Sequence, residues 1–497
     1  MKGVKLQFNR ENVLVYISYF LWVILLVCSM LMMGVMKKSR LFPTKIIISC
    51  CALCIIVLAF LLFLSRRKQN WSCILASVIS IFIISATIFA VCMIRNVLNT
   101  LNNLTSTGIQ TESVIAVVLK DSLVTDIGET GNLRFGDYFD SDKELRKEAY
   151  KKIGEMNGNQ DLSANPYQSI LELSSALINN DIDIAVFNKG YSGILEEALP
   201  EFSNNTRIIY ESDFAVHANA DEKVEKTQAE SIDTKEKQIF GESINVYISG
   251  IDIEGDISLK SRSDVNIIMT VNPFTNTILL TTTPRDYFVY IPEVSGDMRD
   301  KLTHAGIYGV DASIRTLENL YGVDIDNYLR INFDSLIELV DAIGGIDVYS
   351  EYAFSGRGYT FEEGINHLNG EEALVFARER YAFSEGDNQR GKNQMAVIQA
   401  IIDKLQSPAI LKNSEDVLHV VEESMQTDFT ADEISEMISW QLANAKEWNV
   451  EQQAVYGSGD MQQTYSMRGM ELYVMWPDDY SVTQAAERIM EVKKEKE

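Results

Sequence analysis

Three apolar runs near the N-terminus constrain the fold of this chain more than any other feature. They cover residues 13–36, 46–64 and 73–94, and none of them contains a charged residue. Each is close to the roughly 20 residues that an α-helix needs to cross the hydrocarbon core of a bilayer. A cleaved secretory signal has a single, shorter apolar region and does not account for three runs. We therefore expect a three-span membrane anchor over residues 1–98.

Basic residues around the three runs indicate an orientation. With a cytoplasmic N-terminus, the inside carries Lys2, Lys5, Arg10, Arg66, Arg67 and Lys68, and the outer loop carries Lys37, Lys38, Arg40 and Lys45. The positive-inside bias is modest but favours this arrangement. An odd number of spans then places the chain after Arg95 outside the cell. The expected location is the cell membrane, multi-pass, with extracellular C-terminal domains.

Composition excludes several kinds of site and partner. The net charge of −26 argues against nucleic-acid binding, which requires clustered Lys and Arg. All six cysteines lie in the first hundred residues, so neither disulfides nor thiolate metal sites hold the later part together. The four histidines are not closely paired, and neither the G-x-S-x-G nor the G-x-x-x-x-G-K-[ST] motif occurs. These patterns disfavour a zinc hydrolase, a serine hydrolase and a phosphate-loop nucleotidase.

The remainder of the chain reads as two α/β units and an extension. Residues 99–220 form an accessory domain, in which strands at 114–119, 182–187 and 207–210 alternate with helices at 142–153, 167–178 and 192–199. Residues 221–238 are a charged linker. Residues 239–405 carry buried strands at 245–251, 265–271 and 277–283 and helices at 311–321, 334–343 and 388–405. This pattern predicts a central sheet with helices on both faces, on which a C-terminal extension (residues 406–497) packs.

Several arginines in residues 239–405 follow a pattern that suits a phosphate ligand. An extended backbone over residues 376–381 would place Arg378 and Arg380 on one side of a strand. The apolar stripe of the next helix, extended backward by threes and fours, reaches Gln394, Arg390 and Asp387 near its N-terminal end. Forked guanidinium groups bind phosphate oxygens well. The alternative is a structural network of ion pairs.

Carboxylates beside these arginines suggest a divalent cation. Asp252 follows one strand-like run and Asp264 opens the next, while Arg262 and the Arg285-Asp286 pair flank such strands. Mg²⁺ usually takes one or two protein carboxylates together with phosphate oxygens. We therefore expect a diphosphate site with Mg²⁺ as cofactor, or Mn²⁺ in its place.

Six motifs in order resemble the LytR-CpsA-Psr family of bacterial cell-wall enzymes. They are SRSDVNIIMTVNP (261–273), TPRDYFVYIP (283–292), DKLTHAG (300–306), YLRINFDSLIELVDAIGGIDV (328–348), HLNGEEALVFARER (367–380) and DNQRGKNQ (387–394). The resemblance covers residues 245–405. Three spans and an extra domain also resemble the CpsA-type members associated with capsule loci. The resemblance implies an α/β/α catalytic domain with a central mixed sheet.

The resemblance also implies an activity and a role for each site residue. The enzyme would transfer a glycopolymer, capsular polysaccharide or a related wall polymer, from a polyprenyl diphosphate carrier to peptidoglycan, releasing polyprenyl phosphate. Asp252 and Asp264 would hold Mg²⁺, and Arg285, Arg262 and Asp387 would act in catalysis. The diphosphate would be held by Arg262, Arg285, Arg378, Arg380, Arg390, Gln394 and Lys301. Capsule-assembly proteins would be further partners.

A second function class remains open at this point. The same binding groups would serve a regulator of capsule assembly that binds a lipid-linked saccharide without turning it over. Retention of both Asp252 and Asp264 favours the Mg²⁺-dependent phosphotransferase, because arginines alone would satisfy binding.

Overall fold

The computed structural model describes residues 13–106, 110–139, 142–159, 162–216, 242–251, 257–406, 417, 419–420, 424–444 and 446–495. The predicted linker at 221–238 and the predicted metal ligand Asp252 lie outside these residues. The chain divides into two compact units. One comprises Met1–Thr105, Gln238–Phe240 and Phe429–Glu447, and the other Ser106–Lys237, Gly241–Asp428 and Trp448–Glu497.

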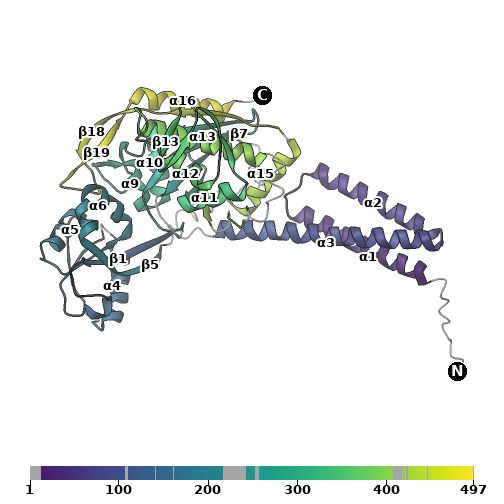
Figure 1. Cartoon of the computed structure of the whole chain (residues 1–497), viewed down its shortest axis with the longest axis horizontal. Helices are drawn as coiled ribbons and strands as arrows, with labels where there is room; N and C mark the ends of the chain where they lie inside the picture. The colour runs from purple at the N-terminus through teal and green to yellow at the C-terminus, as the bar shows by residue number, and fades with distance from the viewer. Residues whose placement is uncertain are drawn as a thin grey trace, which may run out of the picture. The chain divides into compact units, whose positions relative to one another are not determined.

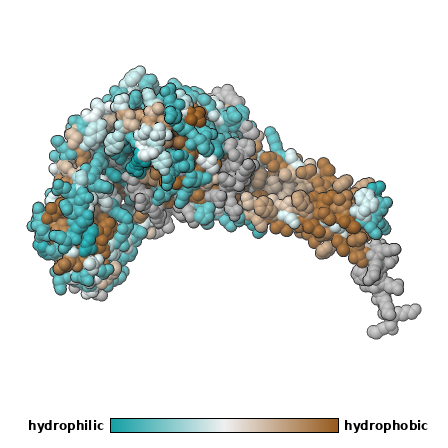
Figure 2. Space-filling view, viewed as in Figure 1, coloured by the Kyte–Doolittle hydropathy of each residue, from teal (hydrophilic) through white to brown (hydrophobic). Residues whose placement is uncertain are grey.

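Three long helices form most of the first unit: α1 (Val13–Lys38), α2 (Thr44–Arg66) and α3 (Asn70–Ser106). Each is long and apolar enough to cross a membrane, which confirms the three predicted helices. Many of their large apolar side chains are exposed, and Figure 2 shows hydrophobic residues over their surface. Apolar side chains exposed to water are unfavourable, whereas the hydrocarbon core of a bilayer accommodates them. The exposed apolar surface therefore indicates that these helices face lipid.

A fourth helix, α15 (Ala431–Asn444), belongs to the same unit although it lies more than 300 residues further along the chain. Its residues Ala431 and Ile434 pack against an apolar cluster that includes Met36, Leu41 and Ile94. Arg40, in the connection between α1 and α2, lies 3.4 Å from both Asp432 and Glu436. The connection between α1 and α2 therefore lies at the same end of these helices as α15.

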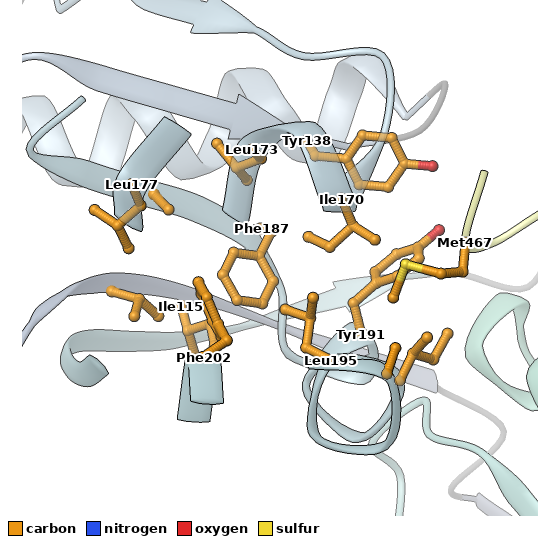
Figure 3. Packing of buried hydrophobic residues seen from close by; sticks show 14 of the residues in the cluster. Ile115, Tyr138, Ile170, Leu173, Leu177, Phe187, Tyr191, Leu195, Phe202 and Met467 are labelled. Atoms are coloured by element: carbon orange, nitrogen blue, oxygen red, sulfur yellow. The ribbon is translucent and has the colours of Figure 1, made fainter. Parts of the chain in front are cut away.

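The accessory domain is a five-stranded sheet of order β3-β2-β4-β1-β5 with helices on both faces. The strands are β1 (Gln110–Leu119), β2 (Phe135–Tyr138), β3 (Ala164–Pro166), β4 (Ile184–Asn188) and β5 (Thr206–Val216). The helices are α4 (Lys143–Asn157), α5 (Ile170–Ile178), α6 (Ser192–Ala198) and α7 (Pro200–Asn205). Alternate residues of β1 enter two separate cores: Ile115 packs with α5 and α6, and Val114 with α4. Figure 3 shows the first core, which also receives Met467 from the C-terminal segment.

The second domain, which we call the catalytic domain after the activity that the resemblance implies, is built on a six-stranded mixed sheet of order β16-β11-β6-β7-β8-β17. The strands are β6 (Ile244–Ile251), β7 (Ser263–Asn272), β8 (Thr277–Thr282), β11 (Asn327–Asn332), β16 (Met425–Thr427) and β17 (Asn449–Ala454). β6, β7 and β8 are antiparallel neighbours, whereas β11 runs parallel to β6 and β17 parallel to β8. Both edge strands come from residues 406–497, the segment predicted to pack on this domain.

Helices cover both faces of this sheet, which confirms the predicted α/β class (Figure 1). On one face, α10 (Val310–Tyr321) and α16 (Asp479–Lys494) pack against Tyr247, Ile268 and Leu279. On the other lie α11 (Phe333–Ala342), α12 (Gly370–Arg378) and α13 (Asp387–Gln406). Among the described residues of this domain there are also four two-stranded antiparallel sheets and two short helices. They are β9 (Phe288–Tyr290) with β10 (Arg299–Lys301), β12 (Ile346–Ser350) with β15 (Gly364–Leu368), β13 (Phe354–Gly356) with β14 (Tyr359–Phe361), β18 (Gly457–Gln463) with β19 (Glu471–Pro477), α9 (Leu302–Ala305), and the one-turn helix Gly306–Tyr308.

The predicted strand at residues 376–381 is wrong, because residues 376–378 are the last turn of α12. A capping box starts this helix: the Asn369 side chain accepts from the backbone of Glu372, and the Glu372 side chain accepts from the backbone of Asn369. This reciprocal pair satisfies N–H groups that the first turn leaves unpaired. The alternating Phe-Ala-Arg-Glu-Arg pattern therefore reflects a helix that ends, at Glu379, in extended backbone.

Candidate functional site

A pocket of about 270 Å³ lies beside the N-terminal end of α13 and gathers cations from four parts of the catalytic domain. The polar residues that line it are Asp264, Arg285, Arg357, Arg378, Glu379, Arg380, Tyr381, Arg390 and Gln394. Five of them are arginines and two are carboxylates, so the pocket carries an excess of positive charge. Six of them (Asp264, Arg285, Arg378, Arg380, Arg390 and Gln394) are residues that the sequence predicted for the site.

The first two turns of α13 supply the most buried part of the pocket. Arg390 is 8% exposed and Gln394 is 9% exposed, and they lie one turn apart on the inward face of the helix. Arg390 pairs with Asp387 at the start of the same helix. Gly391 brings this helix close to β8, since a Cβ there would lie 3.0 Å from Thr282 Oγ1. The inward orientation predicted from the apolar stripe therefore holds.

Asp264, at the start of β7, is held by neighbours on two other elements. Its Oδ1 accepts hydrogen bonds from Arg285, at 2.9 Å, and from the Thr303 hydroxyl, at 3.2 Å. Burial alone would raise the pKa of Asp264, but Arg285, followed by Arg262 and Arg390, lowers it to about 2. The carboxylate is therefore ionised at neutral pH, as a metal ligand or an arginine partner must be.

Arg285 is the cation that joins the pocket to a buried lysine. Burial works against its charge, but Asp264 and then Asp286 outweigh burial and raise the pKa of Arg285 above its usual value. Its Nε lies 3.8 Å from Asp286 Oδ2, and the other oxygen of Asp286 lies 2.7 Å from Lys301 Nζ. A guanidinium in this setting stays charged, so Arg285 can stabilise an anion but cannot take up a proton.

Arg378 and Arg380 line the pocket and are half-buried. The Arg378 guanidinium lies 4.0 Å from the centre of the Phe333 ring, and that of Arg380 lies 4.7 Å from the centre of the Tyr381 ring. Arg380 also donates to the Tyr381 hydroxyl at 2.6 Å. Aromatic stacking orients a guanidinium group, and the planar fork of that group matches phosphate oxygens.

Arg357 is a pocket residue that the sequence analysis missed. It lies in the turn between β13 and β14, is exposed, and adopts a left-handed backbone with φ of +47°. An exposed arginine in a Gly-Arg-Gly turn has no hydrophobic pattern around it to mark it. Only the folded hairpin brings it to the pocket.

Two predicted diphosphate ligands, Arg262 and Lys301, do not line the pocket. Both cations meet Glu197 of the accessory domain: Lys301 Nζ lies 2.6 Å from Glu197 Oε1, and Arg262 Nη1 lies 3.3 Å from Glu197 Oε2. Lys301 is 1% exposed and has Asp286 as its second carboxylate partner. Their partner is remote in sequence and belongs to another domain, so no local pattern could have indicated it.

Of the two predicted metal ligands, Asp264 alone lies among the described residues. Among those residues, no group of three or more His, Cys, Asp or Glu side chains is placed to hold a metal ion. The second predicted ligand, Asp252, lies outside them. The oxygen donors at Asp264 and Thr303 are of the hard type that Mg²⁺ prefers.

A buried Ser-His-Asp cluster lies near the pocket but is not a hydrolytic triad. Asp300 Oδ1 and Ser466 Oγ lie 2.6 Å and 2.8 Å from the same nitrogen of His304, Nδ1. In a hydrolytic triad the carboxylate and the nucleophile contact opposite ring nitrogens. All three side chains are at most 1% exposed, so the cluster ties the C-terminal segment to α9.

The catalytic domain is similar to known proteins. The LytR_cpsA_psr family matches residues 209–479. The polyisoprenyl-teichoic acid–peptidoglycan teichoic acid transferase TagU of Enterococcus faecalis is 34% identical over 253 residues, which are 50% of this chain and 80% of that protein. The TagU of Halalkalibacterium halodurans is 37% identical over 217 residues, 43% of this chain and 70% of that protein.

Among solved structures, the crystal structure of Bacillus subtilis TagU is 29% identical and covers 52% of this chain and 99% of that one, with a TM-score of 0.41. The family match begins at residue 209, after most of the accessory domain, and runs through both edge strands of the catalytic sheet. It spans more than half of the sequence and contains every described residue of the pocket. The chain therefore belongs to the LytR-CpsA-Psr family.

Proposed function

We propose that this protein transfers a glycopolymer from a polyprenyl diphosphate carrier to peptidoglycan. The observation that carries the proposal is the pocket in which five arginines converge around Asp264. A diphosphate fits that charge and geometry, because guanidinium forks bind its oxygens in pairs. Relatives named as teichoic acid transferases that act on peptidoglycan support the substrate class. A capsular polysaccharide is the glycopolymer we propose, on the basis of the three helices and the accessory domain.

The reaction is a phosphoryl transfer. A hydroxyl oxygen of peptidoglycan attacks the phosphorus that bears the glycan, and the bond from that phosphorus to the bridging oxygen breaks. Polyprenyl phosphate leaves with the bond's electron pair, and the hydroxyl proton passes to solvent or to the departing phosphate. Charge grows on the bridging oxygen as the bond breaks, and the pocket arginines stabilise it there. Arg285, which stays charged, takes an electrostatic role.

Mg²⁺ is proposed as the cofactor, with Asp264 and Asp252 as its protein ligands. An ionised Asp264 with the hard oxygen of Thr303 beside it suits this ion. When bound, the ion neutralises part of the charge of the diphosphate. The arginines orient the same oxygens independently of it.

Reconstitution of the purified full chain in detergent tests the proposal. With a polyprenyl diphosphate glycan, peptidoglycan fragments and Mg²⁺, we expect polyprenyl phosphate release in proportion to glycan attached to peptidoglycan. Asp264→Ala lowers this rate by about 10²–10³-fold, the effect of losing one preorganised electrostatic group. A chelator has the same effect on the native protein. Tight binding of the carrier without release would instead identify a lipid-linked-saccharide-binding regulator.

Localisation outside the cell is a further part of the proposal. Arg40, between α1 and α2, contacts α15, whose chain neighbours β16 and β17 belong to the catalytic sheet. The positive-inside bias places the connection between α1 and α2, and with it α15, on the outer face of the membrane. We expect protease added to intact, wall-stripped cells to digest the chain after Arg95. A catalytic domain that is cleaved only after lysis would reverse the orientation and remove peptidoglycan as acceptor.

A further inference from the structure

One helix of the accessory domain reaches the cations of the catalytic domain. On α6, Gly193 and Glu197 lie one turn apart and face in the same direction. The two oxygens of Glu197 take different partners, Lys301 at 2.6 Å and Arg262 at 3.3 Å. Arg262 also donates to the Gly193 carbonyl at 3.2 Å. A single carboxylate of the accessory domain thus receives two cations of the catalytic domain.

The surface of α6 is shaped for this contact. A Cβ at position 193 would lie 2.6 Å from Arg262 Nε and 2.7 Å from its Cζ, both inside the guanidinium group. A side chain at position 193 would therefore displace the Arg262 guanidinium from its present position beside α6.

From Glu197 a continuous line of ion pairs leads into the pocket. Lys301 Nζ bridges Glu197 and Asp286 Oδ1, the second oxygen of Asp286 faces Arg285 Nε at 3.8 Å, and Arg285 binds Asp264. Lys301 is almost fully buried, so its ammonium group needs both carboxylates. Without Glu197, Asp286 would be the remaining carboxylate partner of Lys301 and would be drawn toward it and away from Arg285.

The two domains are packed together where this line crosses between them. Backbone hydrogen bonds of 2.9 Å join Thr111 to Ser258 and to Lys260, and Lys260 Nζ lies 2.5 Å from Glu112. Ile307 and Met467 of the catalytic domain are buried in the accessory core, where Figure 3 shows Met467 beside Tyr191. Glu197 is therefore presented from a fixed surface.

We propose that Glu197 is a positioning residue for the transfer reaction: it fixes Lys301 and, through Asp286, the guanidinium of Arg285. The accessory domain thereby completes a site whose other residues all lie in the catalytic domain. Glu197 precedes the family match, which starts at residue 209, so this contribution is an addition of this chain to the family domain. The proposal rests on the proposed transferase function.

The experiment compares Glu197→Ala and Glu197→Gln in the full chain, using the same reconstituted transfer assay. Glu197→Ala lowers kcat by about 10- to 100-fold, because displacing a catalytic group by about 1 Å has effects of this size. The KM for the carrier changes little, since Arg378, Arg380 and Arg390 still bind it. Glu197→Gln restores most of the rate, because its amide oxygen still accepts a hydrogen bond from Lys301.

Glu112→Ala is the matched control, because Glu112 also forms an ion pair between the two domains, with Lys260, but within the described residues has no hydrogen bond or ion pair with Lys301, Asp286 or Arg285. We expect its kcat per folded molecule to equal that of the native protein. Equal losses of kcat and melting temperature in both alanine variants would reduce Glu197 to a docking residue and overturn the inference. Unchanged or faster transfer in Glu197→Ala would also overturn the inference. Absence of transfer by the native protein would instead overturn the proposed function, and the inference with it.

Discussion

Replacing Arg380 by alanine is expected to lower glycopolymer transfer by about 10²–10³-fold while leaving the protein folded. In the structure Arg380 contacts Tyr381, which is 84% exposed, so little packing is lost with it. Its removal also relieves repulsion among the pocket arginines. Lysine at this position restores little activity, because it keeps the charge but lacks the planar fork. Transfer rates and thermal unfolding of the same preparations provide the measurement.

Arg468→Ala is the matched control for this experiment. Arg468 is an exposed arginine stacked on Tyr465 at 4.5 Å, much as Arg380 is stacked on Tyr381, but it does not line the pocket. Its replacement is expected to leave transfer unchanged. Native transfer rates in Arg380→Ala would show that the pocket does not hold the diphosphate.

Replacing Arg390 by alanine has a different expected result, because it removes stability as well as activity. Arg390 and Asp387 are paired within the first turn of α13, with side chains 10% and 16% exposed. Loss of one partner leaves an uncompensated charge, which lowers the free energy of unfolding by about 3–5 kcal/mol. For a domain of this size that corresponds to a melting temperature lower by about 10 °C.

The charge of Asp387 gives this prediction a pH dependence. Burial already raises the pKa of Asp387, with Arg390 as the strongest opposing influence, so the alanine variant raises it further. A carboxyl whose folded pKa lies above its unfolded value destabilises the fold at high pH, and protonation relieves this. The melting-temperature deficit relative to the native protein should therefore shrink as the pH falls. A second change, Asp387→Asn, should recover part of the lost stability, and a variant as stable as the native protein would exclude this ion-pair role.

Sequence patterns correctly predicted features that depend on residues close together in the chain. The inward face of α13 followed from its apolar stripe, and Arg390 and Gln394 lie on it as expected. The alternation over residues 376–381 misled because a helix end and a strand both place Arg378 and Arg380 near one another. Asn369 followed by Glu372 was the available signal for a helix start.

Other features depend on contacts that no local pattern encodes. Glu197 meets Arg262 and Lys301 across a domain boundary, and Arg357 reaches the pocket through a hairpin turn. The edge strands β16 and β17 join the sheet only through pairing with β11 and β8, far away in the sequence. Predicting such contacts requires the arrangement of whole elements.

The route of the chain between β16 and β17 has a practical consequence for recombinant work. The polypeptide leaves the catalytic sheet after Asp428, forms α15, and returns to the sheet at Trp448. The apolar residues Ala431 and Ile434 of α15 pack with α1 and α3. A soluble fragment that begins after residue 105 keeps this helix but lacks its partners. Its newly bared hydrophobic surface would favour self-association. Joining the two edge strands with a polar loop in place of α15 is the rational way to obtain a monodisperse fragment that lacks the three N-terminal helices.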